Sequence, residues 1–304
     1  MHSGQLALRE RTALPNRVAV SLALPDTEAC LAALQRLAPR IGMAEIRLDL
    51  MERFDLARLI ADAPCPLILT CRPRREMGRF SGSEAERLAI LAQAIRLEAA
   101  YVDVEWDSIA ALSERSGTRV IVSRHWTDRM PDELWSIYEE LRDQADVVKL
   151  VGMAARPHDM LPIFELLARA RGPVIAIAMG AAGQLTRLLA PCFPTCLLTY
   201  GAVATTSTTA AGQLGIDEML AVYQLQHVRP HTAIQLHLCA SAPAPATVSR
   251  LNAAAPPGAV LHVPLIVTAE QAAELLPGLR AYLPRLTISA DAALGPFDAA
   301  SITM

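Results

Sequence analysis

The chain has 304 residues, of which 52% are hydrophobic and 19% are charged, and its formal net charge is −3. This composition provides a large core and excludes general disorder, and the absence of a basic run excludes an electrostatic nucleic-acid partner. No apolar stretch approaches the length of a membrane span, and residues 1–17 lack an apolar signal core. We therefore expect a cytoplasmic protein with no membrane partner. Its six cysteines form no Cys-x-x-Cys pair and are expected to be reduced thiols.

Short apolar or β-branched runs recur at fairly even spacing along residues 1–228 and predict eight strands. They lie at 18–24, 44–50, 66–71, 101–105, 118–123, 146–150, 173–178 and 195–200. Helical periodicity fills the segments between them, at 26–38, 55–61, 83–99, 107–116, 131–144, 159–171, 183–189 and 216–226. Residues 1–228 are therefore predicted to form an α/β fold, a (β/α)8 TIM barrel with parallel strands. An open, doubly wound sheet is the alternative.

Residues 229–304 carry few charges and do not continue the barrel pattern. The segment 240–259 is rich in alanine and proline and is predicted to be a linker or loop. An apolar strand at 260–267, a helix at 269–282 and another short strand follow it. We expect a small α/β C-terminal module here.

Catalytic groups of such barrels lie at the carboxyl ends of the strands or in the loops that follow. Glu45, Arg47 and Asp49 alternate along the predicted strand 44–50, which places them on one face. Other chemically capable side chains follow later strands. They are Arg72, Glu76, His125, Lys149 and Arg187. The sequence therefore predicts one site at this mouth of the barrel.

Lys149 is the only lysine, whereas the other 27 basic residues are arginine. It lies in the apolar segment ADVVKLVG, where burial favours the neutral amine, a nucleophile toward carbonyl groups. Formation of a Schiff base acidifies the neighbouring C–H bond, and His125 is a candidate base for that proton. The alternative for Lys149 is a structural lysine at a strand end, and for His125 a merely hydrogen-bonded imidazole.

The remaining candidates have alternatives of the same kind. Glu76 is placed to orient the imidazole, or it is a solvated loop carboxylate. Arg72 and Arg187 suit a substrate carboxylate or hydroxyl, or they form surface ion pairs. Glu45 can accept hydrogen bonds from substrate hydroxyls, and Arg47 can hold the Glu45 carboxylate in place. The alternative is that the two residues form a buried ion pair inside the barrel, which would give the same sequence pattern.

Together these residues resemble the type I 3-dehydroquinate dehydratase family over residues 17–226. The resemblance is carried by an ordered set of segments. They are AEIRLDL (44–50), TCRPRREMG (70–78), YVDVEW (101–106), VSRHW (122–126), DVVKLVGMA (146–154), IAMGAAGQLTRLLA (177–190) and TYGAVATTSTTAAGQ (199–213). The resemblance implies a syn elimination of water from 3-dehydroquinate, giving 3-dehydroshikimate in the shikimate pathway, without a cofactor or metal. A homodimer is an assembly that the sequence leaves open.

The resemblance also implies individual roles. Lys149 corresponds to the lysine that condenses with the C3 ketone, and His125 to the residue that removes the C2 proton and helps the C1 hydroxyl leave. Glu76 would orient His125, and Arg187 would bind the substrate carboxylate. The positions that hold hydroxyls or form the pocket wall are Glu45, Arg47, Arg72, Met179, Tyr200, Gln213 and Thr209, the last of which replaces a serine.

Two segments depart from the family pattern. Glu-Gly-Gly becomes Glu76-Met77-Gly78, and the Pro-Gly-Gln of the closing loop becomes Ala211-Gly212-Gln213. Loss of a proline gives an open loop more freedom, so its closure over substrate costs more entropy. We expect weaker substrate binding before any loss of chemistry.

The C-terminal segment resembles the start of a shikimate dehydrogenase substrate domain. The Ser-x-Ser motif is missing, Asn252 alone survives near it, and TISADAA contains no lysine where Thr-x-Pro-x-Lys is expected. No glycine-rich dinucleotide loop follows. We expect a degenerate module without dehydrogenase activity that contributes to assembly.

Two other functions stay open from sequence. One is a class I aldolase-like barrel that forms a Schiff base with another keto substrate such as a sugar phosphate. The other is a non-catalytic ligand-binding or scaffold protein, against which the retention of Lys149 as the single lysine argues.

Overall fold

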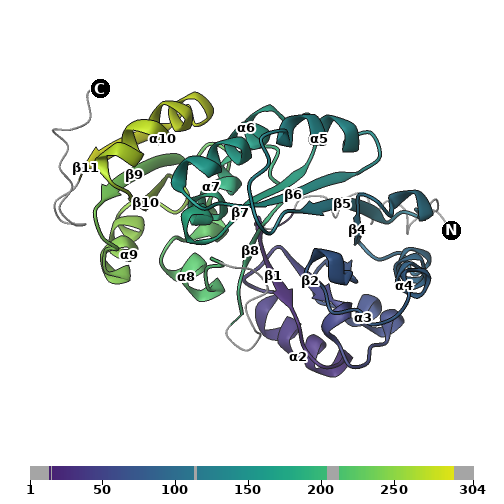
Figure 1. The fold of residues 1–304 in the computed structure, drawn as a ribbon. Helices are drawn as coiled ribbons and strands as arrows, with labels where there is room; N and C mark the ends of the chain where they lie inside the picture. The colour runs from purple at the N-terminus through teal and green to yellow at the C-terminus, as the bar shows by residue number, and fades with distance from the viewer. Residues whose placement is uncertain (1–13, 15, 113–114, 204–211, 291–304) are drawn as a thin grey trace.

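The computed structural model describes residues 14, 16–112, 115–203 and 212–290. Figure 1 shows a barrel of strands wrapped by helices, with a smaller α/β module, green to yellow, beside α6, α7 and α8. Within these described ranges, no helix is long and apolar enough to cross a membrane.

The barrel consists of eight parallel strands in the order β7-β6-β5-β4-β3-β2-β1-β8. Their bounds are β1 Val18–Leu22, β2 Met43–Arg47, β3 Leu67–Thr70, β4 Tyr101–Glu105, β5 Arg119–His125, β6 Val147–Met153, β7 Val174–Met179 and β8 Thr199–Gly201. A parallel bridge between Val174 and Cys196 joins β7 to the chain just before β8 and brings the two edges together. The near-closed barrel confirms the predicted architecture over the open sheet.

Helices connect most of the successive strands, with α8 after β8, and cover the barrel from outside. They are α2 Thr27–Leu37, α3 Leu56–Asp62, α4 Glu84–Arg96, α5 Leu134–Leu141, α6 Leu161–Arg169, α7 Gln184–Leu189 and α8 Ile216–Ala221. Side-chain caps begin several of them: Asp26 for α2, Asp55 for α3, and Ser83 in a capping box with Glu86 for α4. The helix predicted at 107–116 is a 3-10 turn, Ile109–Ala111, in the part that the structure describes.

Alternation along the strands builds two layers inside the barrel. Ala19, Met43, Ile68, Tyr101, Ile121 and Val147 form an inner apolar layer with residues of β7 and β8. Because side chains alternate along a strand, the residues two positions later also face inward, nearer the carboxyl ends. They are Ser21, Glu45, Thr70, Asp103, Ser123 and Lys149, all buried. The sequence thus places a polar layer directly next to the inner apolar layer, on the side of the carboxyl ends of the strands.

The prediction that Asp49 lies on a strand was wrong. Strand β2 ends at Arg47, the last residue in register with β3, and Leu48–Leu50 forms a 3-10 turn. The turn lets both carboxylate oxygens of Asp49 accept from Arg47, through Nε and Nη2 at 2.8 Å each. Likewise, the strand predicted at 195–200 begins only at Thr199.

The C-terminal module consists of β9 Ala233–Cys239, α9 Pro245–Ala254, β10 Val260–Ile266, α10 Ala269–Tyr282 and β11 Leu286–Ala290, in the parallel order β10-β9-β11. The prediction of a linker at 240–259 was wrong for its central residues, which form helix α9. Proline is tolerated in a first helical turn, alanine favours the helix, and Val248 and Asn252 are buried. The module packs on the barrel through α10 and α6, where Gly278 lies against Leu161.

Candidate active site

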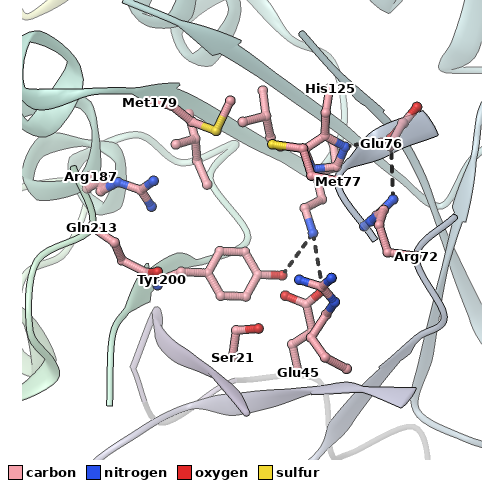
Figure 2. Close-up of a pocket in the computed structure, with 14 residues that line it drawn as sticks. Ser21, Glu45, Arg72, Glu76, Met77, His125, Met179, Arg187, Tyr200 and Gln213 are labelled. Atoms are coloured by element: carbon pink, nitrogen blue, oxygen red, sulfur yellow. Dashed lines mark hydrogen bonds and ion pairs between the residues drawn. The ribbon is translucent and has the colours of Figure 1, made fainter. Parts of the chain in front are cut away.

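Lys149 lies in the polar layer on β6, with only 4% of its surface exposed. Its Nζ donates to Asp103 Oδ2 at 2.8 Å and lies 3.5 Å from both Glu45 Oε1 and the hydroxyl of Tyr200. Figure 2 shows Tyr200 and Glu45, the two labelled neighbours of this amine, in the same pocket. Burial raises the pKa of Tyr200 well above its ordinary value, so the phenol stays neutral. The single lysine of the chain is therefore buried and faces two carboxylates.

Arg72, directly after β3, lies at the centre of the buried charges. Its guanidinium forms ion pairs with Asp103 at 2.9 Å and Glu105 at 2.6 Å, and it donates to the Ser123 hydroxyl at 2.7 Å. Although burial opposes both changes, these pairings raise the pKa of Arg72 and hold the pKa of Asp103 well below its usual range. Both groups are therefore charged in the folded protein.

His125 ends β5, and its Nδ1 lies 2.8 Å from Oε2 of Glu76, which lies in the 3-10 turn Arg74–Glu76. Burial raises the pKa of Glu76 to about 8, against the opposing charge of Arg72. Burial, together with the charges of Arg72 and Lys149, lowers the pKa of His125 well below its ordinary value. Both shifts favour the neutral forms, and the contact with Glu76 fixes the ring. When Nδ1 carries the ring proton and donates to Glu76, Nε2 is the atom that can accept a proton.

Arg187, on α7, differs from the other buried arginines. It is 2% exposed, and its Nε has no hydrogen-bond partner among the described residues. Burial alone lowers its pKa to about 10. Figure 2 shows Arg187 and Gln213 on the side of the pocket opposite Glu45 and Arg72. A buried guanidinium of this kind suits an incoming anion.

These side chains line an open pocket at the carboxyl ends of the strands. The residues that line it are Ser21, Glu45, Arg47, Arg72, Glu76, Met77, His125, Lys149, Val151, Ile177, Met179, Arg187, Tyr200 and Gln213. The structure thus brings together all the predicted site residues except Thr209, which lies outside the described residues. No group of three His, Cys, Asp or Glu side chains in the described ranges could hold a metal ion.

A buried amine and an imidazole with a carboxyl partner can form a Schiff base with a ketone and move a proton, and a buried guanidinium whose Nε is unpaired among the described residues can bind an anionic group of that ketone. Residues 18–230 match the family described as Type I 3-dehydroquinase. The chain belongs to this family.

Curated relatives agree with the family. A 3-dehydroquinate dehydratase from Desulfotalea psychrophila is 34% identical over 221 residues, which are 68% of this type I 3-dehydroquinase and 96% of the relative. A chloroplastic protein from Arabidopsis thaliana, named bifunctional 3-dehydroquinate dehydratase/shikimate dehydrogenase, is 31% identical over 63% of this chain. The match covers 34% of the plant protein.

Solved structures share the fold. The type I 3-dehydroquinate dehydratase from Clostridium difficile aligns with a TM-score of 0.59 and 21% identity, over 68% of this type I 3-dehydroquinase and 90% of that chain. The dehydroquinate dehydratase and shikimate dehydrogenase structure from S. pombe aligns with a TM-score of 0.60 and 22% identity. The alignment covers 93% of this chain and 58% of the S. pombe chain, so the structural likeness extends into the C-terminal module.

One of the two departures from the family pattern is visible at the mouth of this dehydroquinase pocket. Met77 has φ 63°, in the left-handed region, and is 48% exposed beside Glu76. Gly78 follows, and a Cβ on it would lie 1.8 Å from the carbonyl oxygen of Arg72, in the loop after β3. The glycine is therefore required by close approach, whereas the methionine side chain lines the pocket. Ala211, the other departure, lies outside the described residues.

Sequence reasoning gave no role to Asp103, Glu105 or Ser123, although they hold Lys149 and Arg72 in place. The available signal was the alternation of two acids in the buried strand YVDVE, since unpaired carboxylates are rarely buried. It also missed Ser21, whose hydroxyl lines the pocket without a partner among the described residues.

Proposed function

We propose that this chain is a hydro-lyase that removes water from 3-dehydroquinate and releases 3-dehydroshikimate, in the shikimate pathway. The observation that carries the proposal is Lys149, the single lysine, buried in a type I 3-dehydroquinase barrel beside the His125–Glu76 pair. Family membership favours this reaction over the aldolase-like alternative.

The proposed reaction begins when the side-chain amine of Lys149 adds to the C3 carbonyl of the substrate. Loss of the carbonyl oxygen as water forms the C=N bond of a Schiff base, which withdraws electrons from C2. His125 removes the C2 proton, and the resulting enamine expels the C1 hydroxyl, which takes a proton from His125 and leaves as water. Hydrolysis of the C=N bond then consumes one water and regenerates the amine. The net change is the loss of one water molecule.

Substrate recognition uses the two sides of the pocket. Arg187 is proposed to bind the carboxylate, since its buried charge has no carboxylate partner in the described ranges. Glu45, held by the Thr70 hydroxyl at 2.8 Å, faces the opposite side and accepts from substrate hydroxyls. Arg47 and Gln213 complete the polar lining. Thr209 is proposed, from sequence, to add a hydroxyl.

The conjugated enone of the product absorbs in the ultraviolet, which gives a direct assay. The purified chain with 3-dehydroquinate is expected to produce this absorbance, and Lys149→Arg, which keeps the charge without the nucleophile, is the control. A well-folded wild-type protein that produces no enone would refute the proposal. Turnover of a sugar phosphate instead would support the aldolase-like alternative.

We also propose that residues 229–304 form a degenerate shikimate dehydrogenase-like module without dehydrogenase activity, next to a barrel of residues 1–228. The Asn252 amide is fully used within the fold: it accepts from His262 N at 2.8 Å and donates to the carbonyl oxygens of Val222, Val248 and His262. NADP-dependent reduction of 3-dehydroshikimate by the purified chain would contradict this.

The setting of the reaction is part of the proposal. We place it in the cytoplasm, where cysteines that the sequence predicts to be reduced thiols stay reduced. The partner is the small-molecule substrate, and a homodimer stays a prediction that light scattering can test.

A further inference from the structure

Arg87 is a buried arginine that reaches the site from outside the barrel. It lies on α4 and is 1% exposed. Its Nη1 lies 2.6 Å from Glu105 Oε2 and donates to the carbonyl oxygen of Cys71 at 2.8 Å. Nε and Nη2 donate to the two carboxylate oxygens of Glu84, at 2.9 and 2.7 Å. Every side of this guanidinium is therefore held, and none of it lines the substrate pocket.

Glu105 connects Arg87 to the catalytic groups. Its Oε2 faces Arg87 and its Oε1 faces Arg72, each at 2.6 Å, so one carboxylate lies between two guanidiniums. Arg72 continues the connection to Asp103, at 2.9 Å, and it lies 3.6 Å from Oε2 of Glu76, the oxygen that contacts His125. Glu105 and Glu76 therefore compete for one guanidinium.

We propose that Arg87 is a positioning residue for the reaction: by keeping Glu105 ionised, it holds Arg72 toward β4 and leaves Glu76 to orient His125. This inference rests on the proposed function. Without Arg87, a carboxylate facing one guanidinium in a buried site takes up a proton. Arg72 then loses an anionic partner and pairs with Glu76, which draws the carboxyl away from the imidazole.

The charges around these groups give the direction of the effect. Glu105 is faced by Arg72 and Arg87, with Asp103 as a repelling neighbour; burial raises its pKa and the two arginines oppose the rise. Arg72 opposes the raised pKa of Glu76, whereas three carboxylates support it. They are Glu105, Asp103 and Asp107. Neutralising Glu105 therefore removes one repelling charge, so Glu76 ionises at a lower pH.

The test compares Arg87→Met, Glu105→Gln and the double variant, with Arg96→Met at an exposed position of α4 as the matched control. Infrared difference spectra follow the protonated carboxyl band of Glu76, assigned with Glu76→Gln, as the pH is raised. All three variants are expected to titrate this band at least about one pH unit lower than wild type. In all three variants kcat is expected to fall by at least about tenfold, whereas KM should stay within about threefold of the wild-type value. The kcat of the double variant is expected to match that of each single variant, because both changes act through the same carboxylate. Arg87→Lys, which keeps the charge, should recover most of kcat.

The inference would be overturned if Glu76 titrated at the wild-type pH in both single variants. It would also be overturned if the loss of kcat in the double variant equalled the product of the two single losses. If Arg87→Met does not fold, Glu105→Gln decides alone, because the amide keeps the shape of the carboxyl group. The infrared titration needs no turnover. A wild-type chain that fails to dehydrate 3-dehydroquinate would therefore refute the proposed function without deciding the role of Arg87.

Discussion

Replacing Arg187 with methionine should make the protein more stable and less active. Arg187 is 2% exposed and no carboxylate in the described part of the chain pairs with it. The folded protein therefore keeps a desolvated positive charge that only a bound anion would compensate. Methionine fills a similar space without a charge, so the change isolates the electrostatic effect.

The pKa of Arg187 gives the magnitude. Burial lowers it to about 10, and against the usual arginine value of about 12.5 this corresponds to about 3 kcal/mol. Arg187→Met should raise the free energy of unfolding by about 2–3 kcal/mol, because packing contacts that methionine does not replace offset part of the gain. Loss of a buried charge pair with the substrate carboxylate should lower kcat/KM by about 100-fold or more.

Urea unfolding and the enone assay on the same preparations measure both effects. Arg72→Met is the matched control, because it leaves Asp103 and Glu105 with fewer partners and should lower stability by about 3–5 kcal/mol. An Arg187→Met protein that is less stable than wild type and keeps wild-type kcat/KM would show that Arg187 is structural.

Three further predictions concern single side chains. Lys149→Arg should abolish turnover while ligand binding persists, measured by calorimetry beside the enone assay; substantial turnover would exclude the Schiff base. Glu76 has a pKa of about 8 in the fold and an ordinary value of 4.5, so its stabilising contribution is present below pH 4.5 and is lost as the pH rises to 8. Glu76→Gln should therefore gain stability relative to wild type across that range in urea titrations, and a constant difference would contradict the shift. Gly78→Ala should lower both stability and kcat by displacing the Arg72 backbone, and an unchanged melting temperature would argue against that contact.

The barrel could be predicted from sequence because each buried strand is a short apolar run between helices. The ends of the elements were less clear. Strand β2 stops at Arg47 because pairing with β3 stops there, and only the fold reveals this. Helix α9 was not predicted because a segment rich in alanine and proline is typical both of a linker and of a helix that begins with proline.

Most pocket residues could be predicted because they lie on strands or in the loops that follow them, although Ser21 was missed. The residues that support them were not predicted. Asp103 and Ser123 reach Lys149 and Arg72 through the registers that pair β4 with β5 and β5 with β6. Arg87 and Glu105 meet through a helix that packs outside the barrel wall. Such contacts join distant parts of the chain, and neither spacing nor residue type reveals them.

The most direct test is reduction with borohydride in the presence of 3-dehydroquinate, followed by intact mass and peptide mapping. Because Lys149 is the only lysine, a stable adduct can be located without ambiguity between side-chain amines. The account predicts one adduct per chain on Lys149, formed only with substrate and absent in Lys149→Arg. Formation of the enone without an adduct on Lys149 would contradict the Schiff-base mechanism.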